Sequence, residues 1–204
     1  SYNAKRYFKK YNKLKNALAI VNVQKDETIR DIDYIESVIY ELDNAKSIDD
    51  LEVIYDEISE NSLFSDKLKV KSSSKKASNK KAKPMTKNKL TSFNPLKYVI
   101  DGYTVLVGRN NKENDYLTCK FANKNDIWFH TKDIHGSHVI LKTNPNEIVP
   151  DDVLFEVAKL AAKHSKAKNS SHIPVDFCKV SFVKKPSGSK PGYVIYSNNK
   201  TLYV

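Results

Sequence analysis

The sequence is poor in cysteine and has no long apolar run. Its 204 residues contain two cysteines, Cys119 and Cys178, too few for a disulfide scaffold or a four-cysteine zinc site. No stretch approaches the ~20 consecutive apolar residues of a membrane helix, and no secretory leader pattern opens the chain. We therefore expect a cytoplasmic protein in a reducing compartment, with no membrane as a partner.

Signatures of the common enzyme classes are also missing. His164, Ser165 and Cys178 are residue types used as nucleophiles or bases, but neither a glycine-flanked serine turn nor a cysteine–histidine signature surrounds them. The chain has no Walker-type loop and no dinucleotide-binding loop. We expect a binding protein rather than an enzyme, with no cofactor.

Positive charge is what the sequence has in excess, and it is unevenly distributed. The net charge is +11. Residues 1–65 carry 9 basic and 13 acidic residues, residues 66–92 carry 10 lysines and one acid, and residues 93–204 carry 16 basic and 10 acidic residues. The middle stretch has too few large apolar side chains to offset its ordering entropy, so it predicts a flexible linker. Such a linker is either a solvated spacer or a tether that binds phosphate without selectivity.

The first 45 residues predict one long helix, because neither proline nor glycine interrupts them. Their apolar residues follow the 4-3-4-3 spacing of a coiled-coil seam: Tyr7, Tyr11, Leu14, Leu18 and Val21, then Ile32, Ile35, Ile39 and Leu42. Ser47 and Asp50 form an approximate capping box for a second helix that runs to about Asn61. This second helix is too short to cover the whole seam. We expect a partner helix from a segment upstream of Ser1 or from a second copy; the alternative is an intramolecular helical hairpin.

The residues after 93 predict an α+β domain with one main helix on a largely antiparallel sheet. Asp101 and Gly102 supply the tight turn of a hairpin over residues 97–107. The other expected elements are a short helix over 116–121, strands over 126–131 and 138–142, a helix from Pro150 to about Ala167, a β-rich run over 175–183, and a closing hairpin of 192–196 with 201–204 across Asn198–Asn199.

A polar loop after Gly108 is the first candidate RNA site. Backbone N–H groups and the cations can bind phosphate, and the asparagines can bond sugar or base edges. The candidate residues are Arg109, Asn110, Asn111, Lys112 and Asn114. The alternative is that the asparagines cap the loop and Asp115 starts a helix.

Trp128 and His130 form a second candidate, because they share one side of a predicted strand. An exposed Trp128 beside a basic surface would stack on a nucleotide base, although a lone tryptophan is also typical of a core. His138 is a candidate hydrogen-bonding residue for RNA or for a loop. We expect no metal site, because His130, His135 and His138 span a turn and no carboxylate or cysteine completes a ligand set.

A third candidate is a set of lysines. Lys166 lies with Lys163 and Lys168 at a helix end, where lysines also suit the helix dipole. Lys184, Lys185 and Lys190 surround the loop KKPSGSKPG, whose glycines allow close backbone approach and whose prolines lower the entropy lost on binding. This loop is the preferred phosphate contact.

Several long blocks resemble one known family. These are GRNNKENDYLTCKFA, NDIWFHTKDIHGSHVIL, FEVAKLAAKHSKAKNSSHIPVDF and VKKPSGSKPGYVIYSNNKTLYV, which are similar to successive blocks of the NFACT RNA-binding domain. YFKKYNKLK and DNAKSIDDLEVIYDEI resemble the coiled-coil and middle region of the same family, also called fibronectin-binding protein A-like. The chain departs from the family pattern at His135, Lys163, His164 and Cys178.

The resemblance implies a role in ribosome-associated quality control. Family members bind obstructed large ribosomal subunits and recruit tRNA, so that alanine is added to the stalled nascent chain in bacteria. The implied partners are tRNA and the large ribosomal subunit, and the chain is expected to be part of a larger protein. The alternative function is a protein-interaction module or a fibronectin-binding surface adhesin.

Overall fold

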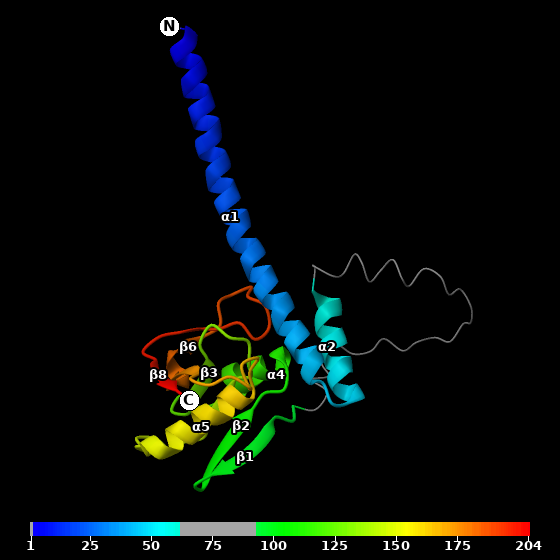
Figure 1. Ribbon diagram of the computed structural model, residues 1–204, viewed down its shortest axis with the longest axis vertical. Coiled ribbons are helices and arrows are strands. Elements are labelled where there is room, and N and C mark those ends of the chain that lie inside the picture. The colour runs from blue at the N-terminus through cyan, green and yellow to red at the C-terminus, as the bar shows by residue number, and fades with distance from the viewer. Residues whose placement is uncertain (1, 62–92) are drawn as a thin grey trace, which may run out of the picture. The chain divides into compact units, whose positions relative to one another are not determined.

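The computed structural model describes residues 2–61 and 93–204 (Figure 1). The chain divides into two compact units, one ending at Ser37 and the other running from Val38 to Val204. The predicted lysine-rich linker, residues 66–92, lies outside the described residues. The proposed boundaries at 65 and 92 therefore stay predictions.

Two helices precede the gap. α1 runs without interruption from Tyr2 to Asn44, as the absence of proline and glycine predicts. α2, Ile48–Glu60, begins with the expected capping box: the Ser47 side chain accepts from the Asp50 amide, and the Asp50 side chain accepts from the Ser47 amide. Neither of these helices, nor any later one in the described ranges, combines the length and apolar character of a membrane span.

The predicted coiled-coil seam of α1 is exposed along most of the helix, including Ile32, Ile39 and Leu42 in its C-terminal part. The side chains of Tyr7, Tyr11, Leu14 and Leu18 are 59–66 % exposed. Apolar side chains this exposed at heptad spacing are typical of a helix that packs against another helix.

The residues after the gap fold around a six-stranded sheet in which every neighbouring pair is antiparallel. The strands in spatial order are β1 (Leu96–Ile100), β2 (Tyr103–Val107), β4 (Val139–Leu141), β3 (Ile127–Thr131), β5 (Pro174–Lys179) and β8 (Lys200–Tyr203). A separate two-stranded sheet pairs β6 (Val183–Lys184) with β7 (Ile195–Tyr196). The predicted α+β class is confirmed.

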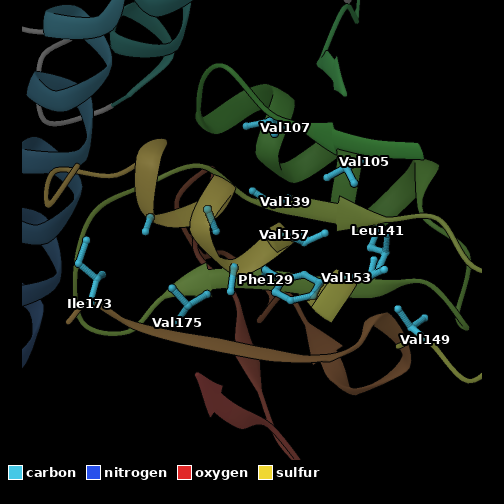
Figure 2. Close-up of a cluster of buried hydrophobic side chains, with 13 residues drawn as sticks. Val105, Val107, Phe129, Val139, Leu141, Val149, Val153, Val157, Ile173 and Val175 are labelled. Carbon is cyan, nitrogen blue, oxygen red and sulfur yellow. The ribbon is translucent and has the colours of Figure 1, made fainter. Parts of the chain in front are cut away.

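One face of the sheet packs against α5, Asp151–Lys163 (Figure 2). Period-two alternation places Phe129 and Val175 on this face, and both side chains are completely buried. The facing side of α5 presents Val153, Val157 and Ala158, which are buried in the same cluster. The small alanine lets the helix lie close to the strands.

The opposite face carries Trp128, Ile140 and Cys178, all buried. It is covered by α4 (Asn111–Tyr116) with the π-helical turn η2 (Leu117–Phe121), and by the segment that begins with the 3₁₀ turn η3 (Val180–Phe182). Both candidate loops of the sequence analysis therefore belong to this side of the sheet.

The structure confirms some local predictions and corrects others. The hairpin turns at Asp101 and Gly102, whose φ angles are 47° and 83°. The predicted closing hairpin is wrong, because β7 pairs with β6 and β8 pairs along β5, with Leu202 opposite Val175. β8 thereby satisfies the backbone groups of β5 that would otherwise lie at a sheet edge. The helix expected over 116–121 begins earlier, at Asn111, because Asn110 caps it.

Candidate nucleic-acid interface

The polar loop after Gly108 turns directly into α4. The Asn110 side chain accepts from the Glu113 amide at 2.9 Å and caps the helix. Gly108 is required by packing: a Cβ here would lie 2.2 Å from Asn114 Oδ1. That oxygen accepts from the His138 amide at 3.0 Å and ties α4 to the start of β4.

The three candidate asparagines are buried, with 3–6 % of their surface exposed. Asn110 caps α4, and Asn114 accepts from the His138 amide just before β4. Asn111 donates from its backbone N–H to Glu41 and from Nδ2 to Glu57 at 3.3 Å. The structure thus corrects the expectation of asparagines presented to sugar or base edges. Capping, the alternative interpretation, describes Asn110.

The two cations of this loop are paired with carboxylates. The Arg109 guanidinium bonds Glu113 through Nη2 at 2.9 Å and Asp50 through Nη1 at 3.1 Å. Lys112 Nζ lies 3.1 Å from Glu60. In the state that the structure describes, neither cation is presented to a phosphate without competition.

The structure brings the loop KKPSGSKPG, residues 184–192, onto α4, and we name this segment the Pro/Gly loop. Asp115 accepts from the Gly192 amide at 3.0 Å and pairs with Lys185. Gly192 has φ +78°, and a Cβ here would lie 2.4 Å from Asn111 Oδ1. Lys190 bonds Asn61 at 3.0 Å. The first candidate set and the lysines of the Pro/Gly loop therefore form one continuous region, which sequence reasoning did not predict.

Trp128 is completely buried, which corrects the expectation of an exposed stacking residue. Its ring stacks on His130 with centroids 5.7 Å apart, meets His138 edge-on at 5.4 Å, and lies 4.7 Å from Tyr196. The Tyr196 hydroxyl donates to Asp176 at 2.8 Å. The strand alternation that placed Trp128 and His130 on one side is confirmed, but that side is interior.

Burial keeps both histidines of this layer neutral. It lowers the pKa of His130 to about 4 and that of His138 to about 3, with the neighbouring His130 as the second cause for His138. His138 Nδ1 lies 2.8 Å from Thr118 Oγ1. Among the described residues, no three His, Cys, Asp or Glu side chains are placed to hold a metal ion.

Exposed lysines gather beside this region, and we name them the Lys184 patch: Lys120, Lys124, Lys179, Lys184 and Lys185. The Ser181 amide bonds the Lys124 carbonyl at 3.2 Å, which brings the two lysine-bearing segments together. Lys120 and Lys185 both lie close enough to the Cys119 thiol to act on its pKa, which burial nevertheless raises.

Sequence reasoning included Lys184 and Lys185 but missed the other three lysines. Partly exposed aromatic side chains border the patch, Phe121 at 44 % and Phe182 at 37 %. None of the three missed lysines belongs to a motif, and only Lys120 carried a local signal, a basic residue beside the aromatic Phe121. Lys166 is exposed after α5, and its amide bonds the His135 carbonyl at 2.8 Å.

Two family models match the sequence. Residues 89–198 match the NFACT protein RNA binding domain. The chain belongs to the NFACT family. Residues 1–80 match the NFACT N-terminal and middle domains, so nearly the whole chain is accounted for by this family.

Relatives in the NFACT family are similar over the full length of the chain. It is 39 % identical over 208 residues to a Bacillus subtilis protein named Rqc2 homolog RqcH, covering 100 % of this chain and 33 % of that protein. A Streptococcus suis protein of the same name is 39 % identical over 206 residues, covering 100 % of this chain and 34 % of that protein. The chain thus spans about one third of these relatives.

A solved structure has the same fold. It is described as the C-terminal of the fibronectin/fibrinogen-binding protein from Streptococcus suis. The TM-score is 0.78 at 38 % sequence identity, and the match covers 99 % of this chain and 74 % of that chain. The fold of this chain is therefore shared with that protein.

Proposed function

We propose that this chain is the RNA-binding part of a ribosome-associated quality-control factor. In this role it binds tRNA on an obstructed large ribosomal subunit in the cytoplasm and helps to recruit that tRNA for alanine tailing. The chain contributes binding rather than catalysis. The observation that carries the proposal is the Lys184 patch on a domain of the NFACT RNA-binding type, and the relatives named Rqc2 homolog support the ribosomal setting.

The chemistry of the patch suits RNA. Lysine ammonium groups neutralise phosphates and release counterions, which makes binding dependent on salt. Partly exposed Phe121 and Phe182 rings beside the lysines offer flat surfaces for unpaired bases. Within this patch only Lys185 has a described carboxylate partner, Asp115.

Replacing Lys184 and Lys185 with alanine is expected to weaken tRNA binding about 10-fold at 0.1 M salt. The slope of log affinity against log salt should also become shallower by about 1–2, because one or two phosphate contacts are lost. Filter binding or fluorescence anisotropy with deacylated tRNA at several salt concentrations measures both quantities.

A matched control is Lys97→Ala/Lys159→Ala, which removes the same charge from β1 and from the exposed side of α5. This control should change affinity less than 3-fold if the patch is specific. Equal losses of tRNA affinity in both variants would show that net charge, rather than the Lys184 patch, sets the affinity. Undetectable tRNA binding by the unmodified chain at low salt would contradict the proposed function.

We also propose that the exposed seam of α1 packs against a helix from the upstream segment or from a second copy. Exposed Tyr7, Leu14 and Leu18 supply the apolar contact. In sedimentation velocity, the isolated chain should self-associate with rising concentration, and Leu14→Lys/Leu18→Lys should abolish the association. A chain that stays monomeric at high concentration would leave the upstream segment as the partner.

Fibronectin binding is a second candidate, favoured by the description of the solved Streptococcus suis relative. A titration of this chain with fibronectin and with tRNA in the same buffer separates the two functions. We expect tRNA to bind more tightly, with a dependence on Lys184 that fibronectin does not share. The reverse order of affinities would favour the adhesin.

A further inference from the structure

α2 places a concentrated negative charge against the polar loop of the domain. It has six acidic residues and no basic one: Asp49, Asp50, Glu52, Asp56, Glu57 and Glu60. Asp50 reaches Arg109 at 3.1 Å and Glu60 reaches Lys112 at 3.1 Å. Asp50 and Glu60 therefore form ion pairs with both cations of the loop.

The Arg109 guanidinium is already oriented for a second anion. Glu113 accepts from Nε at 3.3 Å and from Nη2 at 2.9 Å, which fixes the plane of the group. Asp50 binds Nη1, the nitrogen for which no bond to Glu113 is described. Carboxylate and phosphate oxygens make the same kind of charge-assisted bond to arginine, so a phosphate fits where Asp50 lies.

The contact also buries two carboxyl groups. Glu41, near the end of α1, is 5 % exposed and Glu57 is 2 % exposed. Glu41 accepts from the Asn111 backbone N–H, and Glu57 accepts from Asn111 Nδ2 at 3.3 Å. Burying carboxylates carries a large desolvation penalty, which their hydrogen bonds offset only in part. The contact is therefore specific in geometry but not strongly favoured in free energy.

We propose that α2 is an internal competitor of RNA, in which Asp50 and Glu60 hold Arg109 and Lys112 until an RNA phosphate displaces them. This rests on the proposed RNA-binding function and adds regulation to it. With α2 docked, Arg109 and Lys112 are held by its acids, and in this region of the described residues the Lys184 patch is the basic surface open to RNA. With α2 displaced, Arg109 and Lys112 extend the same basic region, because Asp115 joins α4 to Lys185.

The titration of Glu41 makes the docked state responsive to pH. The groups that face it are Glu57 on α2, Glu113 on α4 and Tyr40 on its own helix. Burial first, and then the charge of Glu57, raise the pKa of Glu41 well above its usual range. A raised carboxyl pKa stabilises docking at low pH and loses that contribution as pH rises through the raised value. Docking should weaken, and RNA binding should strengthen, on the alkaline side.

The first test neutralises the competing acids. Asp50→Asn/Glu60→Gln should raise tRNA affinity about 5-fold at 0.1 M salt, because the RNA no longer has to break two ion pairs in order to bind Arg109 and Lys112. Asparagine keeps an oxygen to accept the capping bonds from Lys46 and Ser47. The matched control is Glu52→Gln/Asp56→Asn, two exposed acids of the same helix, and it should change affinity less than 2-fold.

The second test removes an acid whose loss should weaken tRNA binding rather than strengthen it. Glu41→Gln also removes an acid, but glutamine keeps the acceptor for Asn111 and needs no proton to remain buried. It should favour docking and weaken tRNA binding about 3-fold at pH 8. Simple charge repulsion predicts the opposite, because loss of any negative charge would then improve binding.

The outcomes separate this proposal from the proposed function. Tighter binding by Asp50→Asn/Glu60→Gln than by its control, with weaker binding by Glu41→Gln, supports the competition. Equal affinities for the first two variants, or tighter binding by Glu41→Gln, overturn it while Lys184-dependent tRNA binding stands. If no variant binds tRNA, both fail. Hydrogen exchange gives an independent reading: saturating tRNA should speed exchange of α2 amides, and unchanged exchange overturns the competition.

Discussion

Replacing Gly108 with alanine is expected to destabilise the α+β domain by about 2–4 kcal/mol. The added Cβ would lie 2.2 Å from Asn114 Oδ1 and 3.1 Å from the Asn114 backbone nitrogen. The side chain of Asn114 cannot turn away cheaply, because its oxygen accepts from the buried His138 amide. The cost combines overpacking with a buried donor left without its acceptor. Urea unfolding followed by circular dichroism measures the change.

A double-mutant cycle identifies the cause. In an Asn114→Ala background the clashing oxygen is gone, so Gly108→Ala should cost at least 1 kcal/mol less than in the unmodified chain. Gly188→Ala is a useful comparison, since nothing lies within 4 Å of its Cβ and only its φ of +75° is strained. Additive losses in the cycle would show that contact with Asn114 is not the reason for the glycine.

Lowering the pH from 7 to 5 is expected to destabilise the domain steeply. The folded pKa values of His130 and His138, about 4 and about 3, lie below the unfolded value near 6.5. Between these values the unfolded chain binds protons that the folded chain excludes, so the free energy of unfolding falls as pH falls. Each histidine contributes up to ~1.4 kcal/mol per pH unit once the pH is below 6.

The share of one histidine can be isolated by substitution. His138→Asn keeps a polar group beside Thr118 but does not titrate in this range. Between pH 6 and pH 5 its free energy of unfolding should fall ~1 kcal/mol per unit less steeply than that of the unmodified chain. Glu41 acts with the opposite sign, because its folded pKa is raised, and it is present in both proteins. Parallel curves for the two proteins would contradict the assignment.

Local pattern accounts for the elements that the sequence predicted well. The uninterrupted α1, the capping box of Ser47 with Asp50, and the turn at Asp101–Gly102 each depend on residues within a few positions of one another. Hydrophobic alternation also placed Trp128 and His130 on one side of β3. These features are set by backbone geometry and nearest neighbours, which a single sequence displays directly.

Long-range partners explain what the sequence could not predict about the candidate site. The sequence around Asn111 predicts a polar loop residue, but Asn111 is buried against the carboxyl groups of Glu57 and Glu41, which lie 54 and 70 residues away in the sequence. Tryptophan is a residue type that often stacks on nucleotide bases, but the segment that ends in Tyr196 covers the ring of Trp128. Lys184 and Lys185 were found because their loop is basic by itself, whereas Lys120 and Lys124 joined them only through folding.

The sequence by itself determined the family, the long helix, the α+β class and the excess of basic residues after the first 65 positions. Tertiary structure decided which polar residues face solvent. Folding buries the three candidate asparagines and the ring of Trp128, and it pairs acids of α2 with Arg109 and Lys112. The physical reason is that charge and secondary structure are properties of residues and their neighbours, whereas burial depends on which distant segments pack together.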